Sequence, residues 1–205
     1  MNYRLSRIAA ICGGKFSGCD SEVRSVVTDS RSLSCELGCR PMFVAMRGAN
    51  HDSHDFIAGM QSRGVRAFLV ERGVEASSCT GECGFVQVDN AIEALQRLAA
   101  YHRAQFRGTV VGITGSNGKT VIKEWIAEEL PEGMKYYRSP KSYNSQLGVP
   151  LSVLMLEGDE ELAIFEAGIS KPGEMERLER IISPDAVIFT SIGDAHQENF
   201  INLEQ

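Results

Sequence analysis

Residues 109–120, TVVGITGSNGKT, place a short apolar run directly before a glycine-rich turn that ends in Lys119 and Thr120. The apolar run predicts a buried strand, and a helix is expected to follow from 119 to about 130. Such a turn lets backbone N–H groups converge on a phosphate, aided by the helix N-terminus, a lysine, and a hydroxyl that can bind Mg²⁺. We therefore predict a phosphate-binding loop made of Gly115, Ser116, Asn117, Gly118, Lys119 and Thr120.

The loop departs from the general phosphate-loop pattern at one position, because that pattern has a glycine where this chain has Ile113. The remaining core, Gly-x-x-Gly-Lys-Thr, also occurs by chance in surface turns. Its place between a buried strand and a helix favours a nucleotide site over an ordinary turn.

The second half of the chain alternates strands and helices. Apolar runs at 162–166 and 185–191 predict strands buried on both faces of a parallel sheet. Helical spacing of apolar residues predicts a helix over 173–182 between them. This order predicts an α/β fold with a mostly parallel, doubly wound sheet. We expect residues 107–205 to be the first part of an ATPase domain whose sheet is incomplete at Gln205, as in a truncated chain.

The first half predicts a separate small α/β domain over residues 1–106, followed by a hinge at Arg107-Gly108. Apolar and β-branched runs bounded by turn residues predict strands at 25–28, 42–46, 65–70 and 85–88. Helical spacing predicts helices over 55–63 and 91–105, the second capped by Asp89 or Asn90.

Composition excludes several function classes. The chain has 205 residues, 43% of them hydrophobic and 23% charged, as in a globular protein with a real core. Its apolar runs are far shorter than the roughly 18–20 residues that span a bilayer, so we expect a cytoplasmic protein without membrane insertion. With 21 basic and 27 acidic residues it has a net charge of -6, which argues against nucleic-acid partners.

The six cysteines predict reduced thiols, given the cytoplasmic character of the sequence. Cys35/Cys39 and Cys79/Cys83 have spacings within zinc-ligand range, but the paired-knuckle pattern is absent, which favours free thiols over zinc ligation. His51 and His54 have no further ligand cluster nearby, so capping and packing are expected of them.

The loop sequence TGSNGKT at 114–120 resembles the ATP loop of the Mur ligases, which also lack the first glycine. The continuation Lys123-Glu124 is similar to the branch of that family that adds D-alanyl-D-alanine. Further matching segments follow in the family's order: 28–31 (TDSR), 43–45 (FVA), 54–56 (HDF), 143–150 (YNSQLGVP), 166–168 (EAG) and 195–196 (AH).

The resemblance implies an ATP-dependent ligase that activates a peptide carboxylate as an acyl phosphate, which an amine then attacks. Such chemistry depends on positioning and electrostatics. By resemblance, Lys119, Glu166 and His196 are the catalytic residues: Lys119 holds the terminal phosphates, Thr120 and Glu166 bind Mg²⁺, and His196 helps to bind a second Mg²⁺. Glu166 ends a buried strand, where an unpaired carboxylate is costly, so a ligand role is favoured. His196 alone is equally typical of an ordinary loop.

The substrates implied by the resemblance are UDP-N-acetylmuramoyl-tripeptide and D-alanyl-D-alanine. Asn144 and Ser145 fall in the family's substrate-binding segment, although the family often has a second asparagine where this chain has Ser145. Thr28, Ser30 and Arg31 resemble the segment that holds the uridine diphosphate, and the planar fork of Arg31 suits a phosphate. The simpler alternative for 28–31 is a polar turn that ends a strand.

Three alternatives remain open: another Mur ligase, a folylpolyglutamate synthase, and a noncatalytic module that binds a nucleotide or UDP-sugar. Residues 121–124 argue against the first two. The resemblance also implies a third domain and a carbamylated lysine beyond Gln205, so we expect this chain alone to be inactive. The sequence leaves open a fusion to alanine racemase, the third residue of the peptide and the oligomeric state.

Overall fold

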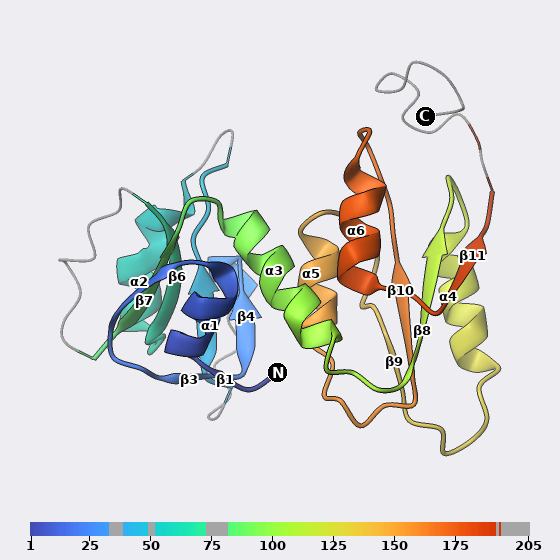
Figure 1. The fold of residues 1–205 in the computed structure, drawn as a ribbon, viewed down its shortest axis with the longest axis horizontal. Coiled ribbons are helices and arrows are strands. Elements are labelled where there is room, and N and C mark those ends of the chain that lie inside the picture. The colour runs from blue at the N-terminus through green and yellow to red at the C-terminus, as the bar shows by residue number, and fades with distance from the viewer. Residues whose placement is uncertain (33–38, 49–51, 73–81, 192, 194–205) are drawn as a thin grey trace. The chain divides into compact units, whose positions relative to one another are not determined.

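The computed structural model describes residues 1–32, 39–48, 52–72, 82–191 and 193 (Figure 1). The elements form a mixed α/β fold whose sheets are mostly parallel, as predicted. No helix in this described part of the chain combines the length and the apolar character needed to cross a bilayer.

The chain divides into two compact units, Met1–Leu98 and Ala99–Gln205. The division falls inside a single helix, α3 (Ala91–Arg103), whereas the domain boundary predicted from sequence follows residue 106. Hydrogen bonds explain the difference, because Arg97 donates to the Cys12 carbonyl in the first unit. Arg103, further along the same helix, donates to carbonyls of the second unit.

The first unit is built on a five-stranded sheet of order β2-β7-β6-β5-β4, in which β2 is antiparallel to β7 and the other neighbours are parallel. Strands β1 and β3 form a separate, short antiparallel pair. The strands are β1 (Tyr3–Arg4), β2 (Lys15–Gly18), β3 (Glu22–Val23), β4 (Ser25–Val27), β5 (Pro41–Val44), β6 (Ala67–Glu71) and β7 (Gly84–Val88). The helices are α1 (Leu5–Cys12), α2 (Ile57–Ser62) and the 3-10 turns η1 (Ser30–Ser32) and η2 (Ser53–Phe56).

All four strands predicted in this unit are present, but α1, β1, β2 and β3 were missed. Helix α1 has eight residues, too few for a clear periodic pattern, and ends where Gly13 adopts a left-handed φ of 69°. Strand β2 is an edge strand with mostly exposed residues, so burial leaves no alternation in its sequence. Of the two predicted caps of the helix that starts at Ala91, Asp89 and Asn90, the structure shows Asn90, whose Oδ1 accepts from the Glu93 N–H at 3.0 Å.

The second unit is built on a parallel sheet of order β11-β8-β10-β9. Its strands are β8 (Thr109–Thr114), β9 (Tyr136–Arg138), β10 (Leu162–Glu166) and β11 (Ala186–Phe189), and its helices after α3 are α4 (Lys119–Glu128), α5 (Gly148–Val153) and α6 (Glu174–Ile182). Strand β9 was missed because it is a three-residue edge strand.

Helices cover both faces of this sheet. On one face, Ile113 and Ile164 pack with Ile122 and Ile126 of α4. On the other, the rings of Tyr137 and Phe165 lie 5.7 Å apart, and the Tyr137 hydroxyl donates to a carbonyl of α5. Every residue of β10 is buried, as predicted for a strand covered on both faces.

Strand β11 departs from that expectation. Val187 is 49% exposed and Phe189 70% exposed. The prediction of burial on both faces is wrong here because β11 pairs with β8 alone and forms the edge of the described sheet. Ile188 is its one residue that packs into the α4 cluster.

Stability of the first unit should depend on the stacked pair Phe68–Phe85, whose ring centroids lie 5.2 Å apart in the core. We expect Phe68→Ala to lower the free energy of unfolding by about 3–5 kcal/mol, because Phe68 is fully buried and leaves a cavity. Phe56→Ala is the matched control, since Phe56 is 48% exposed, and should cost less than about 1 kcal/mol. Urea unfolding followed by circular dichroism measures both; equal losses would contradict this account of the core.

Candidate nucleotide and metal site

Three parallel strands of the second unit deliver the candidate site. Strands β11, β8 and β10 are neighbours, so their carboxyl ends meet at one edge of the sheet. The glycine-rich loop follows β8, Glu166 is the last residue of β10, and Thr190 and Ser191 follow β11. Ligands of open α/β sheets bind at this edge.

Backbone geometry of the loop requires glycine at Gly115. Its φ is 132°, and a Cβ built there would lie 2.2 Å from the Thr190 Oγ1. The segment after β11 holds the loop in place, because Ser116 N–H donates to the Ser191 carbonyl at 2.8 Å and Asn117 N–H to the Ser191 Oγ at 3.2 Å. The conformation of the loop is therefore set by tertiary contacts as well as by its glycines.

The N-terminus of α4 provides the donors that a phosphate needs. Among the described residues, no acceptor is found for the N–H groups of Gly118, Lys119 and Thr120. The Lys119 ammonium lies over the loop, where it donates to the Gly115 carbonyl at 2.5 Å. Free N–H groups, the helix dipole and an ammonium at one point are what an anionic phosphate binds.

Thr120 and Glu166 are brought together as the sequence predicted. The Thr120 hydroxyl donates to the Glu166 Oε2 at 3.1 Å. Adjacent ligands of an octahedral Mg²⁺ with bonds of about 2.1 Å are about 3.0 Å apart, so these two oxygens fit one edge of such a shell. The described residues contain no cluster of three or more His, Cys, Asp or Glu that could hold a metal. Mg²⁺ at this place would therefore take its other ligands from phosphates and water, as it commonly does.

Glu166 has a partner that sequence reasoning missed. Lys123 is fully buried, one turn after Thr120 on α4, and its Nζ lies 2.8 Å from the Glu166 Oε1. The expectation of an unpaired buried carboxylate is thus wrong, and the cost of burying Glu166 no longer favours a metal by itself. The apolar spacing of α4 gave no reason to bury a lysine at this position.

The Lys123 ammonium also joins neighbouring segments. It donates to the carbonyls of Ser139 at 2.7 Å and of Lys141 at 2.5 Å, and lies 3.4 Å from the Glu124 Oε1. Glu124 in turn pairs with Arg138 at 2.8 Å. Lys123 and Glu124, which carried part of the family resemblance, therefore belong to one ion-paired network that includes Glu166 at the end of β10.

Asn144 and Ser145 differ in what they contact. The Asn144 carbonyl accepts from the Gly168 N–H at 2.8 Å, and a Cβ at Gly168 would lie 3.1 Å from the Asn144 side chain. Asn144 therefore lies beside the chain that leaves Glu166. The Ser145 hydroxyl accepts from the N–H of Gly148, the first residue of α5, at 3.0 Å. Its observed contact is structural, and a substrate role for either residue remains a prediction.

The predicted uridine-diphosphate segment follows β4 in the first unit. Arg31 binds Asp29 through both Nε (3.0 Å) and Nη2 (2.8 Å). These hydrogen bonds lower the pKa of the Asp29 carboxyl to about 2. Two of the three guanidinium nitrogens are thus engaged, although the Arg31 side chain is 89% exposed. A phosphate would have to share this guanidinium with Asp29. Thr28 and Ser30 flank the pair in sequence.

Arg47 is a second cation near the carboxyl ends of this sheet, and sequence reasoning did not single it out. It follows β5, lies 3.6 Å from Asp52, and donates to the Arg72 carbonyl after β6. Arg72 pairs with Asp89 at 2.9 Å. Each of these arginines is therefore held by an aspartate, as Arg31 is.

His54 packs inside this unit and is not a metal ligand. Its ring accepts the Glu71 N–H at Nε2 (3.0 Å) and contacts the Asp52 Oδ1 through Nδ1 (2.5 Å). Because both ring nitrogens are used, neither offers a lone pair to a metal. The expectation of packing is thus confirmed for His54, whereas η2 is capped by Asp52 and not by a histidine.

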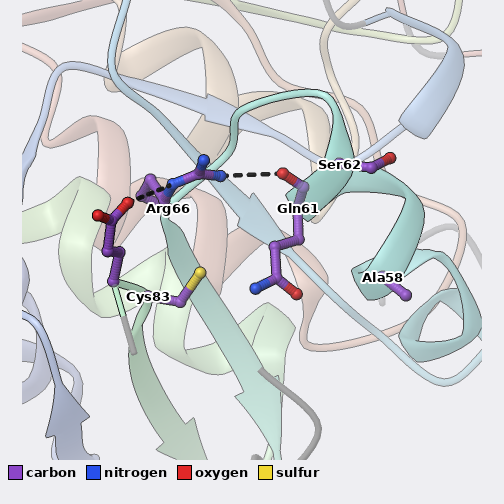
Figure 2. A pocket seen from close by; sticks show the side chains of 6 residues that line it. Ala58, Gln61, Ser62, Arg66 and Cys83 are labelled. Carbon is purple, nitrogen blue, oxygen red and sulfur yellow. Dashed lines mark hydrogen bonds and ion pairs between the residues drawn. The ribbon is translucent and has the colours of Figure 1, made fainter. Parts of the chain in front are cut away.

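A pocket of about 530 Å³ in the first unit contains none of the predicted site residues. Figure 2 shows Arg66 reaching to the Gln61 carbonyl. Arg66 also lies 3.8 Å from Glu82. Burial raises the pKa of the Cys83 thiol in its wall. Arg66 is the one cationic side chain among the described residues that line the pocket, and Glu82 is its ion-pair partner.

Several predicted residues lie outside the described part of the chain. His196, expected at a second Mg²⁺, is one of them, as are His51, Cys35 and Cys79. The four described cysteines, Cys12, Cys19, Cys39 and Cys83, are free thiols.

Comparison with known proteins supports the family resemblance independently of the site geometry. Residues 113–205 match the Mur ligase middle domain. The UDP-N-acetylmuramoyl-tripeptide–D-alanyl-D-alanine ligases of Bacillus subtilis and Escherichia coli are each 32% identical to this chain, over 89% and 99% of its length. The chain spans 38% and 43% of the length of those two relatives.

Solved structures agree with the sequence relatives. MurF from Acinetobacter baumannii superposes with a TM-score of 0.87 at 28% identity, covering 100% of this chain and 44% of that one. MurF from Thermotoga maritima, in complex with ADP, gives a TM-score of 0.75 at 32% identity, covering 89% and 40%. The middle-domain match, which includes the phosphate loop, and the agreement of sequence and structure relatives show that this chain belongs to the Mur ligase family.

Proposed function

We propose that the protein carrying this chain is an ATP-dependent ligase that adds D-alanyl-D-alanine to UDP-N-acetylmuramoyl-tripeptide through an acyl phosphate. The observation that carries the proposal is the phosphate loop, whose Lys119 and Thr120 lie at the sheet edge where the buried carboxylate of Glu166 ends β10. The names of the relatives support the choice of substrates. A cytoplasmic location, predicted from composition, is part of the same proposal.

In this proposal the residues act by positioning and by electrostatics. The N–H groups at the start of α4 and the Lys119 ammonium bind the β- and γ-phosphates, and hold the γ-phosphorus for attack by the peptide carboxylate. Thr120 and Glu166 would hold Mg²⁺, which supplies charge neutralisation on the transferring phosphoryl group when bound. His196 keeps its proposed role at a second Mg²⁺. No side chain of the chain needs to act as a nucleophile.

Substrate binding is assigned to two segments. Thr28, Ser30 and Arg31 would bind the uridine diphosphate, to whose phosphate oxygens the exposed guanidinium of Arg31 can donate beside Asp29. Asn144 and Ser145 form the second segment. Asn144, next to the chain that follows Glu166, would contact substrate, and Ser145 would support the turn at 144–148 through its hydrogen bond to Gly148.

A noncatalytic nucleotide-binding module is the alternative from another class. It would bind ATP but would form no ligation product. Mass spectrometry of a mixture of the protein that carries this chain, ATP, Mg²⁺, UDP-N-acetylmuramoyl-tripeptide and D-alanyl-D-alanine separates the two. The proposal expects a condensed product and released phosphate in equal amounts; ATP binding with no product would favour the alternative.

Nucleotide binding should depend on Lys119. We expect Lys119→Met to weaken ADP binding by about 1.5–3 kcal/mol, roughly 10- to 150-fold, because it removes a charge-assisted hydrogen bond to phosphate. Lys135→Met is the matched control, since Lys135 pairs with Asp159 on the surface. Calorimetry with ADP measures both variants, and unchanged affinity in Lys119→Met would refute the phosphate-loop assignment.

Binding of the UDP-linked substrate should depend on Arg31. We expect the chain to bind UDP-N-acetylmuramoyl-tripeptide, and Arg31→Met to weaken that binding about tenfold through loss of a phosphate contact. Arg24→Met, which removes another exposed arginine with a glutamate partner, should leave the affinity unchanged. If calorimetry finds equal affinities for Arg31→Met and the unmodified chain, residues 28–31 are a polar turn and not a phosphate site.

A further inference from the structure

The charge balance around Glu166 is unusual for a metal ligand. Its Oε1 lies 2.8 Å from the Lys123 ammonium, and both side chains have no exposed surface. Oε2 accepts the Thr120 hydroxyl, which is uncharged. The carboxylate that should attract a cation therefore already has a cation of its own.

Lys123 is held firmly in that place. Its Nζ donates to the Ser139 carbonyl at 2.7 Å and to the Lys141 carbonyl at 2.5 Å. The Glu166 Oε1, 2.8 Å away, is held by charge, since that oxygen has no hydrogen-bond partner among the described residues. Buried ammonium groups are tolerated when they are paired and hydrogen-bonded in this way. The lysine cannot leave Glu166 without giving up contacts to the 139–141 turn.

The surrounding charges do not restore a negative site. Glu124, 3.4 Å from the Lys123 Nζ, is paired with Arg138, so the four ion-paired side chains sum to zero. Lys119 adds a positive charge one turn earlier on α4. Mg²⁺ gives up its water reluctantly and prefers sites with carboxylate or phosphate charge, which these described residues do not offer without a nucleotide.

We propose that Lys123 is the resident counter-charge of Glu166, and that this pairing makes the site bind a divalent cation together with nucleotide phosphates and reject the free cation. The inference rests on the proposed function, in which Glu166 is a metal ligand. Lys123 acts on the metal through Glu166 and is a positioning residue, not a catalytic one.

Free Mn²⁺ is the probe, measured by electron paramagnetic resonance without nucleotide. Removing a unit charge roughly 5 Å from a divalent ion inside a protein is worth an order of magnitude in affinity or more. Lys123→Met should therefore bind free Mn²⁺ at least about tenfold more tightly than the unmodified chain. Lys123→Gln, which keeps a donor for the Ser139 carbonyl, should show the same gain and serves if Lys123→Met does not fold. Lys135→Met, the surface control, should behave as the unmodified chain.

The double variant Lys123→Met/Glu166→Gln tests the route of the effect. It should lose the gain, because the carboxylate that becomes available in Lys123→Met is absent. Unchanged or weaker Mn²⁺ binding in Lys123→Met and Lys123→Gln, or a gain that persists in the double variant, overturns the inference.

A separate measurement distinguishes failure of the proposed function. Glu166→Gln should weaken Mn²⁺ binding in the presence of ADP at least about tenfold, because a charged ligand is lost. If Glu166→Gln leaves Mn²⁺ binding with ADP unchanged, Glu166 is not a metal ligand and the proposed metal site itself is wrong. If that variant weakens Mn²⁺ binding and the Lys123 variants do not strengthen it, the counter-charge inference alone is wrong.

Discussion

Parallel pairing of β10 with β8 is the constraint on which the candidate site depends. Glu166 is in register with Ile113, one residue before the end of β8, so the carboxylate reaches the same sheet edge as the loop that starts after Thr114. Pairing of β11 on the other side of β8 brings Thr190 and Ser191 against Gly115 and Ser116. In a parallel sheet the carboxyl ends of all strands lie at the same edge. The topology alone therefore brings the glycine-rich loop, Glu166 and the segment after β11 together.

The buried ion pair of Lys123 and Glu166 then sets the local charge at that edge of the sheet. Taking Lys123 and Glu166 out of water is costly. The cost is offset by their ion pair, by the two carbonyls that accept from Lys123, and by the Thr120 hydroxyl that donates to the Glu166 Oε2. The same contacts connect α4 to the turn before Asn144. The Lys123 ammonium thus connects the helix that follows the predicted phosphate loop, the proposed metal ligand Glu166 and the turn before Asn144.

The first unit uses its charges differently. Arg31, Arg47 and Arg72 follow strands of its sheet, and each is paired with an aspartate while remaining largely exposed. Exposed pairs of this kind contribute little to stability. In contrast, His54 lies buried with both nitrogens engaged and serves the fold.

The sequence by itself determined the α/β class, the long strands and helices, and the phosphate loop, because periodicity and glycine placement are local properties. It could not reveal β2 or β9, because these are short edge strands that form only by pairing with a neighbouring strand. Nor could it show that Lys123 neutralises Glu166, or that Asp29 engages Arg31 along two guanidinium nitrogens. Those facts required tertiary structure, since a charge acquires its partner and its burial from residues that the fold alone brings within a few ångströms.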